Sequence, residues 1–150
     1  MVEIVDNTSI LISACLIGQA VRYDGNGKLI NHSILINWSK LGILIPLCPE
    51  VKGGLPIPRS PAEIKKDSNG TIAVVNIDNN DVTEEFKIGA NIALEVCLKK
   101  NVKMAILTES SPSCGSNEIY DGSLSAVKIK GEGITSILLR ENGIKVFNEF

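Results

Sequence analysis

Short apolar runs alternate along the chain with segments of helical periodicity. The clearest runs lie at residues 10–16, 43–48 and 104–107. Each is brief and rich in Ile, Leu or Ala, which is typical of strands buried on both faces of a parallel sheet. The segment 144–147 is predicted to be a fourth strand. Pro46, inside the second run, requires a position where the sheet needs no backbone donor.

Residues between these strands follow the 3.6-residue period of helices. Apolar positions in 31–40 predict a short amphipathic helix, and a longer apolar stripe over 82–97 predicts the main helix. A third helix is predicted at 134–141. Cys97 lies on the apolar stripe of the main helix, so we expect it to be a small buried hydrophobic residue.

Two further segments follow neither pattern. Residues 63–66 and 71–77 flank the turn sequence Asp67-Ser68-Asn69-Gly70, which predicts an antiparallel hairpin, placed at an edge of the sheet. Residues 49–61 are rich in proline and glycine, and this composition predicts a shaped loop without regular structure. Such loops often carry function.

The alternation of strands and helices predicts an α/β fold. We expect one domain over residues 1–150, a single-domain Rossmann-like layered fold with a mainly parallel sheet and an antiparallel hairpin. A chain of this length buries about 68–70% of the surface that its unfolded form exposes. It therefore needs no disulfide or structural metal to form a core.

Charge and hydropathy exclude two classes of partner. Fifteen Lys and Arg against 17 Asp and Glu give a net charge of −2, without a basic block that could bind a nucleic acid backbone. The longest apolar runs reach about half of the roughly 20 residues that cross a membrane. Residues 1–6 contain acids where a secretory signal has Lys or Arg, so we expect a cytoplasmic protein.

Three of the four cysteines lie at the carboxyl end of a predicted strand or in the segment that follows one. They are Cys15, Cys48 and Cys114. Because loops that leave the carboxyl ends of parallel strands converge at one edge of the sheet, these thiols are expected to meet. A disulfide framework is not expected in a chain of this size without an export signal. A closed zinc site is not expected either, since close cysteine pairs are missing and the only histidine, His32, is predicted to lie on a surface helix.

The residues alone leave several kinds of thiol chemistry open. Three soft thiolates without a fourth ligand fit a metal site with one open position, including an iron–sulfur cluster. The same thiols could hold zinc or iron in a binding module without turnover. A third possibility is a cysteine nucleophile with two structural companions, although His32 is the only histidine that could serve as its base.

Motifs along the whole chain resemble one known family. They are Ser13-Ala14-Cys15-Leu16-Ile17-Gly18, Val21-Arg22-Tyr23-Asp24-Gly25, Cys48-Pro49-Glu50, Gly53-Gly54-Leu55-Pro56, Pro58-Arg59, Asp81-Val82-Thr83, Ser111-Pro112-Ser113-Cys114-Gly115, Tyr120-Asp121-Gly122 and Gly131-Glu132-Gly133. In this order they are similar to the family once catalogued as a domain of unknown function and now associated with thiouracil desulfidase. The resemblance implies a 4Fe-4S cluster held by Cys15, Cys48 and Cys114, with one iron free for the substrate's sulfur. It also implies that Glu50 and Ser111 are catalytic.

This resemblance predicts an iron–sulfur enzyme that removes sulfur from a small thiouracil-like compound and releases hydrosulfide. An open iron polarises a carbon–sulfur bond, so water can attack the carbon without net electron transfer. Glu50 would act as general base for that water, and Ser111 would orient the water or the substrate. Transfer of the sulfur to an acceptor is the alternative within the same chemistry. We expect the cluster to be lost in aerobic preparations.

Four further residues are candidates for substrate binding. Tyr23 could stack on a planar ring, and Asp24 could contact the substrate from its loop or simply form a turn. Arg59 could bind the substrate or the cluster, or tie its loop to a carboxylate such as Glu63. Ser113 is the fourth candidate.

Overall fold

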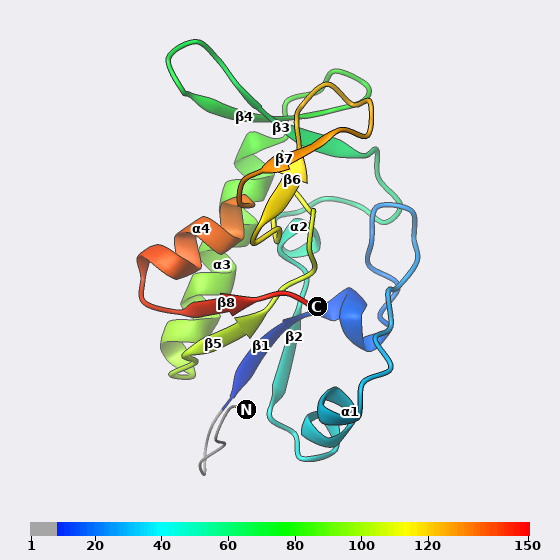
Figure 1. Ribbon diagram of the computed structural model, residues 1–150, viewed down its shortest axis with the longest axis vertical. Helices are drawn as coiled ribbons and strands as arrows, with labels where there is room; N and C mark the ends of the chain where they lie inside the picture. Colours follow the sequence, from blue (N-terminus) through cyan, green and yellow to red (C-terminus); the bar gives the residue numbers. More distant parts are fainter. Residues whose placement is uncertain (1–8) are drawn as a thin grey trace.

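A parallel sheet forms the centre of the computed structural model, which describes residues 9–150 (Figure 1). Its strands are β1 (Ile10–Ser13), β2 (Leu44–Leu47), β5 (Met104–Ile106) and β8 (Lys145–Phe147), in the order β2-β1-β5-β8. All three pairings are parallel, which confirms the expected sheet. The prediction from residues 1–6, no export signal, lies outside the described residues.

Strand β1 lies inside the sheet and packs against a core on each face. All four of its residues are buried. Leu11 packs into a core with the long helix, whereas its neighbour Ile12 packs into a second core on the opposite face. Successive strand residues point to opposite faces, and each buried aliphatic side chain contributes about 1.5–3 kcal/mol. Pro46 lies in the edge strand β2, where its missing donor is tolerated as expected.

The helices cover the sheet in two layers. Helices α3 (Thr83–Lys99) and α4 (Ile134–Glu141) pack together on one face, and α1 (Ser33–Lys40) lies on the other side of the sheet (Figure 1). All three were predicted, and Cys97 is buried on α3. Helix α1 has no fully buried residue, and His32 caps it by accepting a hydrogen bond from the Ile34 amide. No helix in residues 9–150 is long and apolar enough to cross a membrane.

Two short helices correct the sequence predictions. The first predicted strand ends at Ser13, and Ala14–Ile17 form the 3-10 helix η1 instead, ended by Gly18 in a left-handed conformation. The segment 49–61 is not wholly irregular, because Pro49–Lys52 form helix α2. The fixed φ of proline suits the first position of a helix, so Pro49 starts the helix that it was expected to prevent.

Helix α2 is held against α3 by close backbone contacts. A Cβ atom on Gly53 would lie 1.9 Å from the Glu85 carbonyl oxygen, and one on Gly89 would lie 1.9 Å from the Pro49 carbonyl oxygen. Any side chain at either glycine would force the helices apart. This packing fixes the segment that carries Cys48 and Glu50.

Two hairpins lie together beyond the end of the parallel sheet (Figure 1). Strands β3 (Ala62–Lys66) and β4 (Ile72–Asn76) form the predicted hairpin, but as a separate two-stranded sheet and not at the edge of the main one. Strands β6 (Glu118–Tyr120) and β7 (Lys128–Lys130) form a second hairpin that was not predicted. Each of these strands has three residues, with one or two charged side chains, and contains no apolar run.

Candidate active site

A cavity of about 450 Å³ lies at the carboxyl ends of β1, β2 and β5, and three cysteines line it. Cys15 comes from η1, Cys48 precedes α2, and Cys114 lies in the loop between β5 and β6. Cys97 does not line the cavity. The strand order therefore brings together the three thiols that the sequence singled out and leaves the fourth in the core.

Burial disfavours the charged thiolate and so raises the pKa of all three thiols. It raises the pKa of Cys15 to about 11, with a further contribution from the neighbouring Cys48. It raises the pKa of Cys114 to about 12 and also raises the pKa of Cys48. The charge of Cys48 influences both other thiols, so the three sulfurs share one electrostatic environment. Metals bind the thiolate, so metal binding here would release protons.

The donor set fits a cluster better than a single ion. All four cysteines have free thiols. Among residues 9–150, no three or more His, Cys, Asp or Glu side chains are grouped to hold one metal ion. A tetrahedral zinc with bonds of about 2.3 Å would draw its sulfurs to within about 4 Å of one another. A cluster binds each cysteine to a different iron, so three soft donors around one cavity can hold it without meeting at a single ion.

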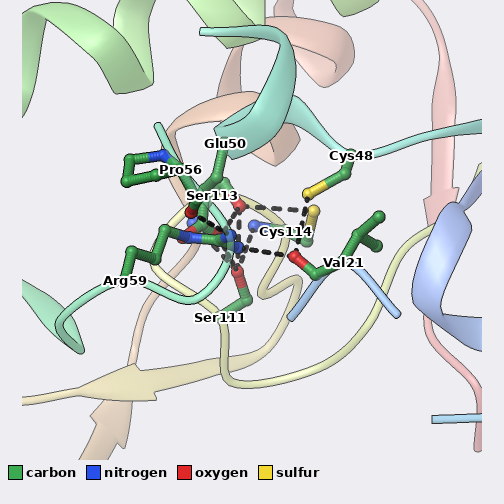
Figure 2. Close-up of polar contacts among 8 residues, drawn as sticks. All are labelled: Val21, Cys48, Glu50, Pro56, Arg59, Ser111, Ser113 and Cys114. Carbon is green, nitrogen blue, oxygen red and sulfur yellow. Dashed lines mark hydrogen bonds and ion pairs between the residues drawn. The ribbon is translucent and has the colours of Figure 1, made fainter. Parts of the chain in front are cut away.

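Glu50 and Arg59 form an ion pair beside the thiols (Figure 2). Arg59 Nε lies 3.2 Å from Glu50 Oε1, and the exposed fractions of the two side chains are 6% and 16%. The guanidinium also donates to the carbonyl oxygens of Val21 at 2.9 Å and Pro56 at 3.2 Å. Arg59 thus orients Glu50, and it ties its loop to a carboxylate as one of its expected roles required, although the partner is Glu50 and not Glu63.

Two serines connect this carboxylate to the thiol of Cys114 (Figure 2). Ser111 Oγ accepts hydrogen bonds from the amides of Ser113 and Cys114, both at 3.2 Å, so its own proton is available for donation. It lies 2.9 Å from Ser113 Oγ, which donates to Glu50 Oε2 at 3.0 Å. Ser113 Oγ also lies 3.4 Å from Cys114 Sγ. The hydroxyl groups of Ser111 and Ser113 therefore form a hydrogen-bonded chain that ends on Glu50. Ser113 also lies next to the sulfur of Cys114.

The structure separates the two candidates in the 21–25 loop. Tyr23 lines the cavity, and 42% of its surface is exposed. Asp24 does not line the cavity, and its carboxylate accepts a hydrogen bond from the Asn26 amide at 3.0 Å. Asp24 is thus a turn residue, which was the second of its two expected roles.

Sequence reasoning missed two carboxylates that organise the loops. Glu109 Oε1 accepts hydrogen bonds from four backbone amides, those of Ser110, Ser116, Asn117 and Glu118. Burial opposes its ionisation, yet these bonds and one from Asn148 lower the pKa of Glu109 to about 2. These bonds hold the two ends of the loop that carries Cys114 together. The signal was an acid in the segment that follows β5.

The second missed carboxylate joins the chain's last residues to this region. Glu149 accepts hydrogen bonds from the Glu109 amide at 2.8 Å and from Thr108 Oγ1 at 3.1 Å. It also pairs with Lys28 at 2.6 Å. The Lys28 amide donates to the Cys15 carbonyl oxygen at 2.7 Å. Glu149 therefore connects the loops that carry Cys15 and Cys114, and nothing in the local sequence indicates this long-range pairing.

Two groups of residues within the cavity lining differ in origin. We call the first the cysteine side; it consists of Cys15, Cys48, Glu50, Ser111, Ser113 and Cys114. The second, the hairpin side, comes from the two small sheets and their loops and consists of Glu63, Tyr120, Leu124, Ala126 and Lys128. The sequence predicted none of the hairpin side as part of a site.

Comparisons with known proteins agree with this geometry. A family model described as 2-thiouracil desulfurase matches residues 10–150. The uncharacterized protein YbbK of Bacillus subtilis (strain 168) is 39% identical over 145 residues, which span 93% of this chain and 95% of that protein. A solved structure of the 4Fe-4S-dependent thiouracil desulfidase TudS is 47% identical, with a TM-score of 0.89 over 95% of this chain and 91% of its own.

The match to the family model spans the sheet, both hairpins and the segments that form both sides of the cavity. These similarities confirm the resemblance that the sequence motifs indicated and the α/β fold class. The chain belongs to the 2-thiouracil desulfurase family.

Proposed function

We propose that this protein removes sulfur from a small thiouracil-type compound by hydrolysis. Water adds to the carbon that bears sulfur, the carbon–sulfur bond breaks, and the products are the oxygen-containing ring and hydrosulfide. No electron is gained or lost. The family match and the likeness to a 4Fe-4S-dependent thiouracil desulfidase support this activity over a binding module without turnover.

Cys15, Cys48 and Cys114 would hold the 4Fe-4S cluster. Support comes from the three free thiols around one cavity and from the 4Fe-4S dependence of TudS. When bound, the cluster supplies a Lewis-acidic iron that polarises the carbon–sulfur bond and accepts the departing sulfur. Three cysteines leave one iron without a protein ligand, which is the position that such chemistry requires.

Glu50 serves as the general base in this proposal. The observation that carries the assignment is the position of its Oε2 atom, 3.0 Å from Ser113 Oγ, which in turn lies 3.4 Å from Cys114 Sγ. A water molecule near these hydroxyl groups would give its proton to Glu50. Arg59 holds the other carboxylate oxygen, so the base faces the cavity in one orientation.

Ser111 and Ser113 orient the water and the substrate. Two backbone amides occupy the lone pairs of Ser111 Oγ, so this hydroxyl group acts as a donor. Ser113 is buried, and its hydroxyl group donates to Glu50. When a thiolated ring binds, either hydroxyl group can donate to a ring heteroatom while Glu50 keeps the water.

The test is anaerobic reconstitution with iron and sulfide, followed by incubation with 2-thiouracil. We expect equal amounts of uracil and hydrosulfide without any reductant or acceptor. Glu50→Gln should lose turnover but retain iron, whereas Glu84→Gln, on the exposed surface of α3, should match the wild type. Uracil formation that depends on an added acceptor, without release of free hydrosulfide, would instead indicate sulfur transfer. No conversion of any thiolated ring by protein with a full cluster would contradict the proposal.

A further inference from the structure

The loop between β6 and β7 forms part of the cavity wall in an unfavourable backbone conformation. It contributes Leu124 and Ala126 to the hairpin side. Their φ angles are 59° and 64°, in the left-handed region that L-residues disfavour. Residues persist in this region only where the surrounding structure holds them, and such positions are frequent at ligand clamps.

A buried carboxylate holds this loop in place. Glu63 on β3 is 8% exposed, and its Oε1 accepts hydrogen bonds from the amides of Gly122 at 3.0 Å and Leu124 at 3.1 Å. No ion pair found within residues 9–150 includes Glu63. A buried carboxylate without a cation depends on its hydrogen bonds, so the carboxylate and the loop stabilise each other.

Backbone packing fixes the same loop from a second direction. Gly122 has a φ of 95°, and a Cβ atom there would lie 2.7 Å from the Ile64 carbonyl oxygen. The start of the loop therefore rests directly on β3, next to Glu63. Leu124 follows two residues later, so its distance from the cysteine side is set by β3 and not by the parallel sheet.

We propose that Leu124 is a specificity-determining residue that limits the size of ring the cavity accepts, and that Glu63 is its positioning residue. This inference rests on the proposed desulfidase function and adds the feature that selects among thiolated rings. Leu124 offers an apolar contact on the hairpin side, and the reacting groups lie on the cysteine side. One extra or missing methylene on the ligand changes discrimination in an apolar pocket by about 10-fold to 200-fold.

The positioning role is tested by backbone amide hydrogen exchange in the full chain, without any substrate. In Glu63→Ala we expect the amides of residues 121–127 to exchange at least tenfold faster than in the wild type. Glu63→Gln should restore protection, because its amide oxygen can still accept both bonds. Unchanged exchange in Glu63→Ala would overturn the positioning role. If Glu63→Ala does not fold, the comparison is made with Glu63→Met, which has a similar length and no oxygen acceptor: faster exchange there supports the positioning role, and wild-type exchange overturns it.

The specificity role is tested with 2-thiouracil and the larger 6-propyl-2-thiouracil. Leu124→Ala should raise kcat/KM for the larger ring, relative to the smaller, at least tenfold and mainly through KM. Val127→Ala is the matched control, because Val127 belongs to the same loop, is 49% exposed and does not line the cavity. It should leave the ratio within twofold of wild type.

The outcomes separate the inference from the function on which it rests. A wild type that converts 2-thiouracil, with a ratio unchanged in Leu124→Ala, overturns the specificity role alone. A reconstituted wild type that converts neither ring contradicts the proposed function, and the specificity role fails with it. The exchange experiment then still decides whether Glu63 holds the loop.

Discussion

The cysteine side and the hairpin side of the cavity are supported in different ways. On the cysteine side, Cys15 and Cys48 come shortly after the parallel strands β1 and β2, which contribute residues to the buried cores. On the hairpin side, Lys128 lies on the exposed strand β7 and Leu124 on the β6–β7 loop, which donates two hydrogen bonds to Glu63. One side follows the strands of the main sheet, whereas the loop of the other side is held by a few polar contacts.

This difference separates chemistry from recognition. Close packing in the core resists small displacements, so the reacting groups keep their relative positions. A wall held by a few hydrogen bonds is easier to move or replace. We therefore expect changes on the cysteine side to lower kcat and changes on the hairpin side to alter KM or ring preference.

The largest expected effect comes from the base on the cysteine side. Glu50→Gln should lower kcat about 1,000-fold, because a general base contributes roughly 10²–10⁴-fold. The iron content and KM should stay within twofold of wild type, as measured by metal analysis and steady-state kinetics. A Glu50→Gln variant with wild-type kcat would assign the base elsewhere and remove the chemical role of this side.

A smaller effect is expected where Arg59 supports Glu50. Arg59→Lys should lower kcat/KM about 10-fold to 100-fold, since one ammonium group cannot contact Glu50 and both carbonyl oxygens of Val21 and Pro56 at once. Steady-state kinetics on the reconstituted variant will measure this. Full activity with lysine would mean that only the charge at position 59 matters and that orientation of Glu50 does not.

On the hairpin side, Lys128 provides the corresponding test. Lys128 lines the cavity, and its ammonium group lies 5.6 Å from the centre of the Tyr120 ring. Lys128→Ala should raise KM by about tenfold at most and leave kcat unchanged, since a cation over an aromatic ring contributes about 0.5–1 kcal/mol at an exposed site. Lys130→Ala, on the same strand but outside the cavity, is the control. A fall in kcat would show that the two sides are not separable.

The smallest effect concerns the stability of the cysteine side. The pKa of Glu109 is lowered from 4.5 to about 2 in the folded protein, so its contribution is complete above about pH 4.5 and decreases as the pH falls toward 2. Allowing for solvent screening, we expect Glu109→Gln to lose about 1–2 kcal/mol of unfolding free energy at pH 6. This difference should shrink by pH 3, as measured by urea unfolding at both values. An equal difference at both pH values would contradict the role of the charge.

The sequence was informative where a functional residue lies next to a strong local pattern. Cys15 and Cys48 directly follow apolar runs, so the rule that strand ends converge was enough to bring them together. Cys114 lies farther from its strand, yet Glu109 folds its loop back toward the same cavity. The parallel sheet and the long helix were predictable for the same reason.

Prediction failed where long-range hydrogen bonds decide the structure. Arg59 selects Glu50 and not Glu63, because α2 turns Glu50 toward the cavity and β3 turns Glu63 toward the β6–β7 loop. The β6–β7 hairpin has no apolar alternation that would reveal it. Glu149 pairs with Lys28, which lies more than a hundred positions away along the chain. No local pattern encodes these partners.

The most direct test of the account is the iron and acid-labile sulfide content of anaerobically reconstituted protein. We predict about four irons and four sulfides per chain. Cys15→Ala, Cys48→Ala and Cys114→Ala should each lose the cluster, and Cys97→Ala should keep it because this thiol is buried on α3 outside the cavity. Zinc in place of iron, or a full cluster in any of the first three variants, would contradict the assignment of these cysteines as its ligands.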